Sequence, residues 1–201
     1  AAVDAHVKLG FEAIGLKRIG FDIADTGDNC ATIEAHGSVC NGLTSWRASS
    51  DELLKSCTKA YNLAYSTGSV ITYDVCGIGA SAAPKFIELN DSRSTQGGYI
   101  EVKYNKFNAG SRALVDADSD YMPNVTHKDH FANAKAQAWW LVADRFRNTF
   151  DAITNGTEYN DDELISIRSD VPELELLMAE LSQPQKDIDN NGRVCVESKK
   201  K

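Results

Sequence analysis

Two aspartates occupy positions where an α/β sheet would bring them together. Asp22 lies in a strand-like run over residues 18–24, and Asp74 closes a second strand-like run over residues 70–74. A carboxylate near the end of a buried strand is costly unless it is paired, hydrogen-bonded or bound to a cation. Carboxylate oxygens are the ligands that hard divalent cations such as Mg²⁺ take. The pair therefore indicates a divalent metal site.

The neighbours of both aspartates suit such a site. Alternation along the first strand places Asp22 on the same face as Gly20 and Ala24, whose small side chains leave room for a cation and its waters. Asp74 precedes a glycine turn into a helix, at the carboxyl edge where open α/β sheets bind their ligands. If the two strands are neighbours, both carboxylates reach one magnesium ion.

A second explanation of the pair needs no metal. Asp22 would form an ion pair with a lysine or arginine, and Asp74 would cap the helix that follows it. Asp25 and Asp28, in the turn after the first strand, are further possible ligands, but turn formation is the more ordinary role for aspartate there.

The glycines after Asp74 offer a competing function. Gly77, Gly79 and Ala82 satisfy a relaxed dinucleotide pattern, G-x-G-x-x-A, between a strand and a helix. Asp74 would repel the bound pyrophosphate, and the region about 20 residues further on is a polar turn instead of a strand bearing the ribose acid. We therefore expect these glycines to let the helix begin close beside Asp74.

Other motifs favour structural roles. The run from Asp187 to Gly192 imitates a calcium loop, but Ser198 occupies its twelfth position and its flanks alternate as strands do, so we predict a hairpin. His127 and His130 precede a long helical pattern, where solvated or capping side chains are the default and an active-site role is the minority case. The five cysteines include no C-x-x-C pair and are expected to be reduced and mostly buried.

Composition limits the class of protein. At 201 residues the chain fits one domain, and 29 acidic against 21 basic residues give a formal charge of -8. Passive, charge-driven DNA binding is therefore disfavoured, and any nucleic-acid contact must come from a local basic patch or a bound metal. No run approaches the roughly 20 apolar residues of a membrane span, and the N-terminus lacks the apolar core of a signal peptide. We expect a soluble, intracellular protein.

The elements that position the aspartates follow from periodicity and turn residues. Residues 1–16 predict a weak N-terminal helix or a linker. Residues 18–24, 30–36 and 39–46 predict an antiparallel meander. A helix over about 50–65, the strand 70–74 and a helix to about 89 predict parallel pairing, so the sheet is mixed.

The second half of the chain is predicted to contain a strand, a long polar region, two helices and a hairpin. A strand over 99–104 precedes a polar region, 105–128, that is long for a loop and so is expected to be functional or mobile. The longest helix spans 129 to about 150, with Trp139 expected on its buried side and Asn133 and Gln137 on another face. A short segment over 163–167, a helix over 172–181 and a C-terminal β-hairpin over 185–197 complete the prediction.

Six blocks, taken in order, resemble a known family. They are residues 17–25, 73–79, 128–140, 162–166, 179–184 and 187–199. Together they resemble the nuclease domain of the large terminase subunit of headful-packaging tailed bacteriophages. The resemblance implies a ribonuclease H-like α/β domain over residues 17–201, and no G-x-x-x-x-G-K-[ST] sequence for the family's ATPase half occurs.

The resemblance also implies a reaction and a set of residues. Such domains cut concatemeric double-stranded viral DNA with two Mg²⁺ or Mn²⁺ ions held by acids. Asp22 and Asp74 match two of these ligands. The third lies in a helix beyond the part that resembles residues 197–200, so we expect it beyond Lys201, with Asp25, Asp28 and Asp129 as low-ranked substitutes.

The implied partners belong to a viral packaging motor. They are the terminase ATPase domain in the same parent chain, the small terminase subunit and the portal, at the procapsid in the host cytoplasm. Lys199, Lys200 and Lys201 could touch DNA phosphate, although a charged chain end is usually just solvated. Two other readings stay open: a non-catalytic ribonuclease H-like module that binds DNA or the portal, and a junction resolvase-like nuclease.

Overall fold

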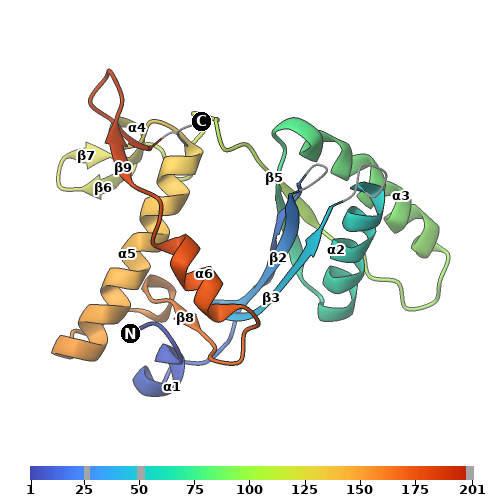
Figure 1. Ribbon diagram of the computed structural model, residues 1–201, viewed down its shortest axis with the longest axis horizontal. Helices are drawn as coiled ribbons and strands as arrows, with labels where there is room; N and C mark the ends of the chain where they lie inside the picture. Colours follow the sequence, from blue (N-terminus) through green and yellow to red (C-terminus); the bar gives the residue numbers. More distant parts are fainter. Residues whose placement is uncertain (25–27, 49–52, 198–201) are drawn as a thin grey trace.

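A six-stranded mixed sheet forms the centre of the molecule. The computed structural model describes residues 1–24, 28–48 and 53–197. The strand order is β5-β4-β1-β2-β3-β8. The helices α2 (Leu53–Thr67) and α3 (Ala82–Ser94) cover one face, while α5 (Ala134–Asn155) and α6 (Leu174–Leu181) lie on the other side of the sheet (Figure 1).

The predicted meander and the predicted parallel strand are both confirmed. β1 (Lys17–Asp22) pairs antiparallel with β2 (Asn29–His36), which pairs antiparallel with β3 (Val39–Arg47). β4 (Val70–Asp74) returns parallel to β1 after α2 has crossed the sheet. Two-residue alternation on β1 and β4 produces this arrangement, because only one face of each strand is apolar.

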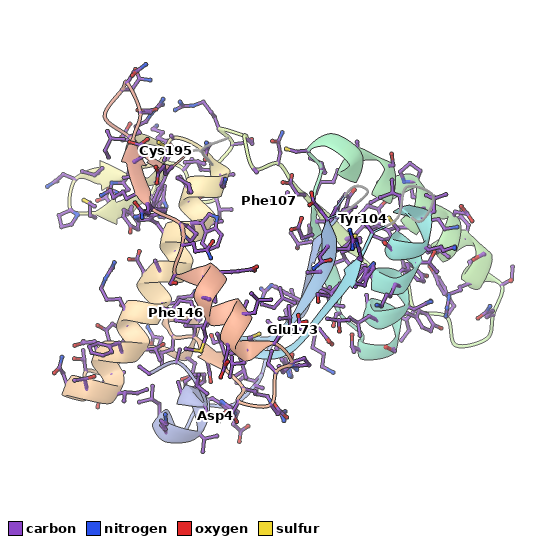
Figure 2. The ribbon with its side chains drawn as sticks, in the orientation of Figure 1. Asp4, Tyr104, Phe107, Phe146, Glu173 and Cys195 are labelled. Carbon is purple, nitrogen blue, oxygen red and sulfur yellow. The ribbon has the colours of Figure 1, made fainter. Side chains whose placement is uncertain are left out.

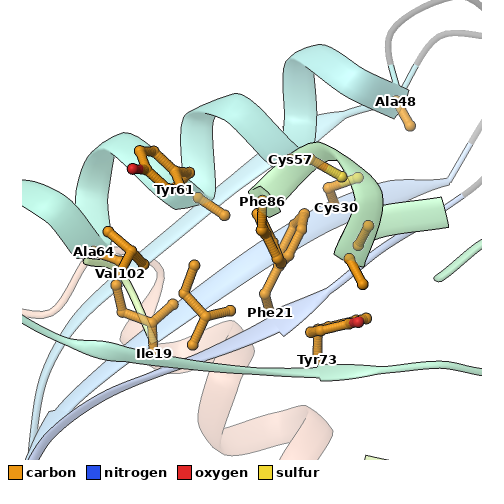
Figure 3. Packing of buried hydrophobic residues seen from close by; sticks show 14 residues of the cluster. Ile19, Phe21, Cys30, Ala48, Cys57, Tyr61, Ala64, Tyr73, Phe86 and Val102 are labelled. Carbon is orange, nitrogen blue, oxygen red and sulfur yellow. The ribbon is translucent and has the colours of Figure 1, made fainter. Parts of the chain in front are cut away.

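The largest core fills the space between the sheet and its two covering helices. Ile19 and Phe21 of β1 and Ile71 and Tyr73 of β4 point into it, and all four are at most 2% exposed. Figure 3 shows Phe21 and Tyr73 beside Phe86 of α3 in this cluster. The alternate residues of both strands, including Asp22 and Asp74, therefore face the opposite side, toward α5 and α6.

The predicted strand over 99–104 is wrong. The strand is β5 (Tyr104–Phe107), which pairs parallel with β4 at the edge of the sheet. Val102 lies before it with its backbone N–H and C=O both bonded to the buried side chain of Asn90, at 3.1 Å each. The Asn90 side chain of α3 thus bonds the backbone N–H and C=O of Val102, which the predicted strand would have used for pairing.

The predicted helix over 129–150 is also wrong at its beginning. The chain forms α4 (His127–His130), breaks, and starts α5 at Ala134 with Asn133 as its N-cap, whose side chain accepts a hydrogen bond from the Ala136 N–H at 2.9 Å. The break exists because Phe131 bridges to Val194, and the Ala132 N–H donates to the Val194 carbonyl. A distant strand therefore overrides local helix propensity.

The remaining elements are short. They are α1 (Ala5–Leu9), η1 (Gly77–Ser81), β6 (Asp120–Met122), β7 (Val125–Thr126), η2 (Asp161–Glu163), β8 (Ser166–Ile167), β9 (Lys186–Ile188) and β10 (Val194–Val196). β9 and β10 pair antiparallel, which confirms the predicted C-terminal hairpin. Val3, ahead of α1, forms a parallel bridge to Ile167.

The structure also bears on the expectations about the cysteines and about membrane-spanning segments. Cys30, Cys40 and Cys57 are buried, and all five cysteines are free thiols. Within the described residues, the structure has no helix that combines the length and the apolar character needed to cross a membrane.

Candidate functional site

The sheet places Asp22 and Asp74 side by side. β1 and β4 run parallel with Phe21 opposite Tyr73, and one further residue along this register brings Asp22 level with Asp74. Neighbouring strands lie about 4.8 Å apart, and level residues on parallel strands point to the same face. Both carboxylates are therefore at the carboxyl edge of the sheet, on the face opposite the main core.

Asp74 is held by the turn that follows it. Its Oδ1 accepts the Cys76 N–H at 3.0 Å, a bond within the turn and not the helix cap of the metal-free explanation, because the N-cap residue of the following 3-10 helix is Cys76 and has no side-chain cap bond. In the described part of the chain, Oδ2 has no hydrogen-bond partner. One oxygen thus fixes the side chain, and the other is available to a cation.

Gly79 allows this turn to approach Asp74 closely. A Cβ at this position would lie 1.9 Å from the Asp74 carbonyl oxygen, a separation that backbone atoms cannot tolerate. Gly77 has a φ of +61°, which favours glycine. The expectation that these glycines let the helix begin beside Asp74 is confirmed.

Asp22 is exposed at the end of β1 and lines a cleft of about 820 Å³. Asp74, on the neighbouring strand, lies outside this lining. The space beside Gly20 is limited by Ile33 of β2, because a Cβ on residue 20 would come within 2.9 Å of Ile33 Cγ2. Room beside Asp22 is thus provided by the cleft and not by the glycine two residues earlier.

The far wall of the cleft comes from the second half of the chain. Lys135 and Trp139 line it from α5, and Glu173 and Glu180 line it from the start and the end of α6. Figure 2 shows Glu173 next to the sheet, where its Oε2 accepts the Ser45 hydroxyl of β3 at 2.9 Å. This contact joins the two walls at one end.

The cleft therefore gathers carboxylates at its rim and walls. Besides Asp22, its lining contains three glutamates: Glu173, Glu180 and Glu197. Among the residues that the structure describes, however, no three histidine, cysteine, aspartate or glutamate side chains come close enough together to hold a metal ion. Asp22 and Asp74 fit as two ligands of a divalent ion and leave the rest of its coordination to water or to further groups.

The lower-ranked residues lie elsewhere. Asp28 is exposed in the turn before β2, and Asp129 in α4 accepts the Thr126 hydroxyl at 2.6 Å. Neither lines the cleft. Asp25, Lys199, Lys200 and Lys201 fall outside the described residues, so their assignments remain predictions.

His127 and His130 belong to a structural cluster. They pack with Tyr121 and Phe131, and His127 Nδ1 lies 2.9 Å from the Gln137 side-chain nitrogen. Burial is the main cause that lowers the pKa of His130. The two histidines are therefore packed against aromatic rings between the β6–β7 hairpin and Phe131, and not solvated or helix-capping as expected.

Sequence reasoning missed Lys135 and Glu173, and it placed Trp139 on the wrong face. The helical pattern predicts a buried Trp139 and places Gln137 with Asn133 on another face. In the structure, Gln137 is 3% exposed and Trp139 is half-buried at the cleft. The Gln137 amide replaces solvent by bonding both backbone groups of Val115. The i,i+4 spacing of Lys135 and Trp139 was the available signal.

Comparison with known proteins supports one family. No protein-family model and no curated protein matches the chain. Among solved structures, the nuclease domain of the large terminase subunit gp2 of bacterial virus Sf6 is 28% identical, with a TM-score of 0.84 over 98% of this chain and 84% of that chain. The chain has the fold of a large-terminase nuclease domain.

Two further structures of this terminase nuclease fold carry ligands. A variant of the Sf6 domain with manganese and beta-thujaplicinol has a TM-score of 0.85, and a variant with calcium has 0.83. Both are 28% identical and cover 98% of this chain and 84% of their own. The ribonuclease H-like class of mixed α/β fold is thereby confirmed.

Proposed function

We propose that the chain is a metal-dependent DNA endonuclease domain of a viral DNA-packaging terminase. The observation that carries this proposal is the level position of Asp22 and Asp74 on neighbouring parallel strands, at the open edge of a terminase nuclease fold. Divalent ions bound by such carboxylates supply an activated water and stabilise the leaving 3′ oxygen of the scissile phosphate. Mg²⁺ and Mn²⁺ suit the oxygen ligands present.

The residues of the chain have distinct tasks in this reaction. Asp22 and Asp74 hold the ions, and the Cys76 N–H orients the Asp74 carboxylate through its Oδ1. A third acid would complete the set. The similarity to the Sf6 large terminase subunit supports concatemeric double-stranded viral DNA as substrate.

The same similarity supports the proposed partners. These are an ATPase domain in the same parent chain, the small terminase subunit and the portal, at the procapsid in the host cytoplasm. The formal charge of -8 supports delivery of DNA by such a motor, because the domain alone attracts DNA weakly.

A plasmid nicking and linearisation assay with Mn²⁺ tests the nuclease function. Asp22→Asn and Asp74→Asn keep the shape of the side chain and remove its charge. We expect each to lower cleavage by at least about 100-fold, because even the outer-shell partners of metal ligands are worth about 10–100-fold. Asp91→Asn, at an exposed position of α3, is the matched control and should cleave as wild type does.

Equal cleavage by all four proteins would reject the nuclease assignment. DNA binding that persists without both aspartates, and without cleavage at any metal concentration, would favour the non-catalytic binding module. This second function draws support from the finding that the described residues bring only two acids to the sheet edge. A strong preference for branched over linear DNA would favour a resolvase.

Metal binding gives an independent prediction. With two acids at the edge, we expect weak or single occupancy by Mn²⁺ in isothermal titration calorimetry of this chain. Asp74→Asn should weaken the signal further, and Asp91→Asn should leave it unchanged. Two tight sites would contradict the assignment of only two ligands.

A further inference from the structure

Lys135 and Trp139 face the metal-site aspartate across the cleft. They lie one turn apart on α5, at i and i+4, so both side chains emerge from the same side of the helix. Both line the cleft that Asp22 lines from the sheet. The two walls thus present a carboxylate on one side and a cation with an aromatic ring on the other.

The backbone fixes this face of α5 relative to Asp74. β5 ends at Phe107, which pairs with Asp74. The loop that leaves β5 then bonds the first turn of α5: the Lys135 N–H donates to the Ala109 carbonyl at 3.0 Å, and the Ala134 N–H donates to the Ser111 carbonyl at 2.8 Å. Lys135 is therefore held at a set position with respect to the sheet edge.

The functional groups of both side chains are available. In the part of the chain that the structure describes, the Lys135 ammonium forms no ion pair and the Trp139 indole N–H has no hydrogen-bond partner. Lys128 and Arg147, by contrast, are paired with Asp118 and Asp144. Among the described residues that line the cleft, Lys135 is also the one cation.

The two neighbouring tryptophans of α5 are both half-buried but differ in what they pack against. Trp140 packs against the buried cluster of Phe131, Ala136 and Val194. Trp139 contributes to none of the buried clusters of the described residues and remains half-buried at the cleft. A large ring kept at a wet surface costs hydrophobic free energy unless something packs on it.

We propose that Lys135 and Trp139 are substrate-positioning residues that hold the sugar–phosphate backbone beside the scissile bond. The ammonium binds a non-bridging oxygen of a neighbouring phosphate, and the indole packs on the adjoining deoxyribose. This role rests on the proposed nuclease function. Contacts to sugar and phosphate fix register without reading sequence, so the pair acts on duplexes of any sequence.

Steady-state nicking with Mn²⁺ separates positioning from chemistry. We expect Lys135→Ala to raise KM about fivefold to tenfold and to leave kcat within about threefold, since a charged hydrogen bond to substrate is lost while the metal ligands stay. Lys135→Arg should restore most of the KM. Lys103→Ala removes the same charge from an exposed site before β5, outside the cleft, and should behave as wild type.

DNA binding tests the same residues without relying on cleavage. Fluorescence anisotropy with two labelled duplexes of unrelated sequence, in Mg²⁺ and at several salt concentrations, should show equal losses for Lys135→Ala on both. The slope of log affinity against log salt should fall by about 0.9, the value for one lost phosphate contact. Quenching of tryptophan fluorescence by DNA should be reduced in Trp139→Phe.

The outcomes distinguish this inference from the proposed function. If wild-type protein binds DNA but never cleaves it, the proposed nuclease function fails. The slope of log affinity against log salt for Lys135→Ala then still tests whether Lys135 contacts a DNA phosphate. A Lys135→Ala protein with wild-type KM and salt slope overturns the inference, as does an equal loss in Lys103→Ala. Thermal melting of each variant checks folding, with Lys135→Gln as the second variant if Lys135→Ala melts early.

Discussion

Single residues at the sheet edge are held by backbone contacts instead of by side-chain packing. The Asp74 carboxylate is oriented by the Cys76 N–H, and the Asp74 carbonyl lies against Gly79. A change of one methyl group here moves the backbone that carries the proposed metal ligand. The site is therefore sensitive to a substitution that leaves every acid in place.

Gly79→Ala tests this sensitivity. The added Cβ meets a carbonyl oxygen at 1.9 Å, so the turn must shift away from Asp74. We expect cleavage to fall at least about tenfold and stability to fall by about 1–3 kcal/mol, as overpacking does. Gly97→Ala is the control, because a Cβ there meets nothing within 4 Å. Wild-type nicking rates in Gly79→Ala would contradict the close approach.

At the scale of elements, α5 connects the cleft to the strand at the far edge of the sheet. Thr149 of α5 is fully buried, and its hydroxyl donates to the Ile165 carbonyl at 3.1 Å and accepts the Ile165 N–H at 2.9 Å. Ile165 directly precedes β8. This hydroxyl is thus one of the long-range contacts that hold the helix that carries Lys135.

Thr149→Val is a shape-conserving test of this connection. It leaves the Ile165 N–H and C=O, which are half-buried, without the Thr149 hydroxyl as partner, which costs about 1–3 kcal/mol. For a domain of this size the melting temperature should fall by roughly 2–4 °C for each kcal/mol. Thr58→Val is the control, because its hydroxyl bonds only the Leu54 carbonyl of its own helix. Equal melting of the two variants would show that the hydroxyl does not hold α5.

The C-terminal hairpin is a second element with a testable anchor. The Arg193 guanidinium and the Arg193 and Asn191 N–H groups bond Asp189 and lower the pKa of its carboxyl to about 2. Because this folded-state pKa is depressed, the stabilisation is present above the usual carboxyl pKa of about 3.9 and is lost as the pH falls toward 2.

Amide hydrogen exchange of the hairpin, followed by NMR, checks this pH dependence. Protection of the Asn191 and Arg193 amides should persist at pH 5 and decline between about pH 4 and 2. Asp189→Asn should show reduced protection already at pH 5. Protection in wild type that stays constant down to pH 2 would contradict the assigned anchor.

At the scale of the whole molecule, the charge distribution makes DNA binding depend on cations. The formal charge is -8, and among the described residues of the cleft lining four carboxylates accompany one lysine. Phosphate approaches such a surface unfavourably until the acids are neutralised. A bound divalent ion and Lys135 would together make the electrostatic potential in the cleft favourable for phosphate.

Anisotropy measurements with and without metal test this dependence. We expect millimolar Mg²⁺ to increase affinity for duplex DNA at least about tenfold over EDTA, a difference of about 1.4 kcal/mol. The double variant Asp22→Asn, Asp74→Asn should bind more tightly than wild type in EDTA and gain little from Mg²⁺. Equal wild-type affinity in Mg²⁺ and EDTA would show that DNA binds away from the acids.

Much of the sheet could be predicted because the sequence patterns that define its strands extend over only a few residues. Alternation over β1 to β4 and the turn residues between them determine strand identity, and the parallel return after α2 follows from the strand–helix–strand order. The errors lie where distant groups compete for the backbone. Asn90 takes the backbone groups of Val102, and Val194 interrupts the helix that local pattern predicted from residue 129.

The sequence by itself determined that Asp22 and Asp74 lie in or at the end of two strands of an α/β fold, because alternation and turn chemistry act over a few residues. Only the tertiary structure decided what faces them. The orientation of α5 depends on long-range contacts such as the Gln137 bonds to Val115 and the loop after β5. Those contacts turn Lys135 and Trp139 toward the cleft, which no periodicity within the helix could specify.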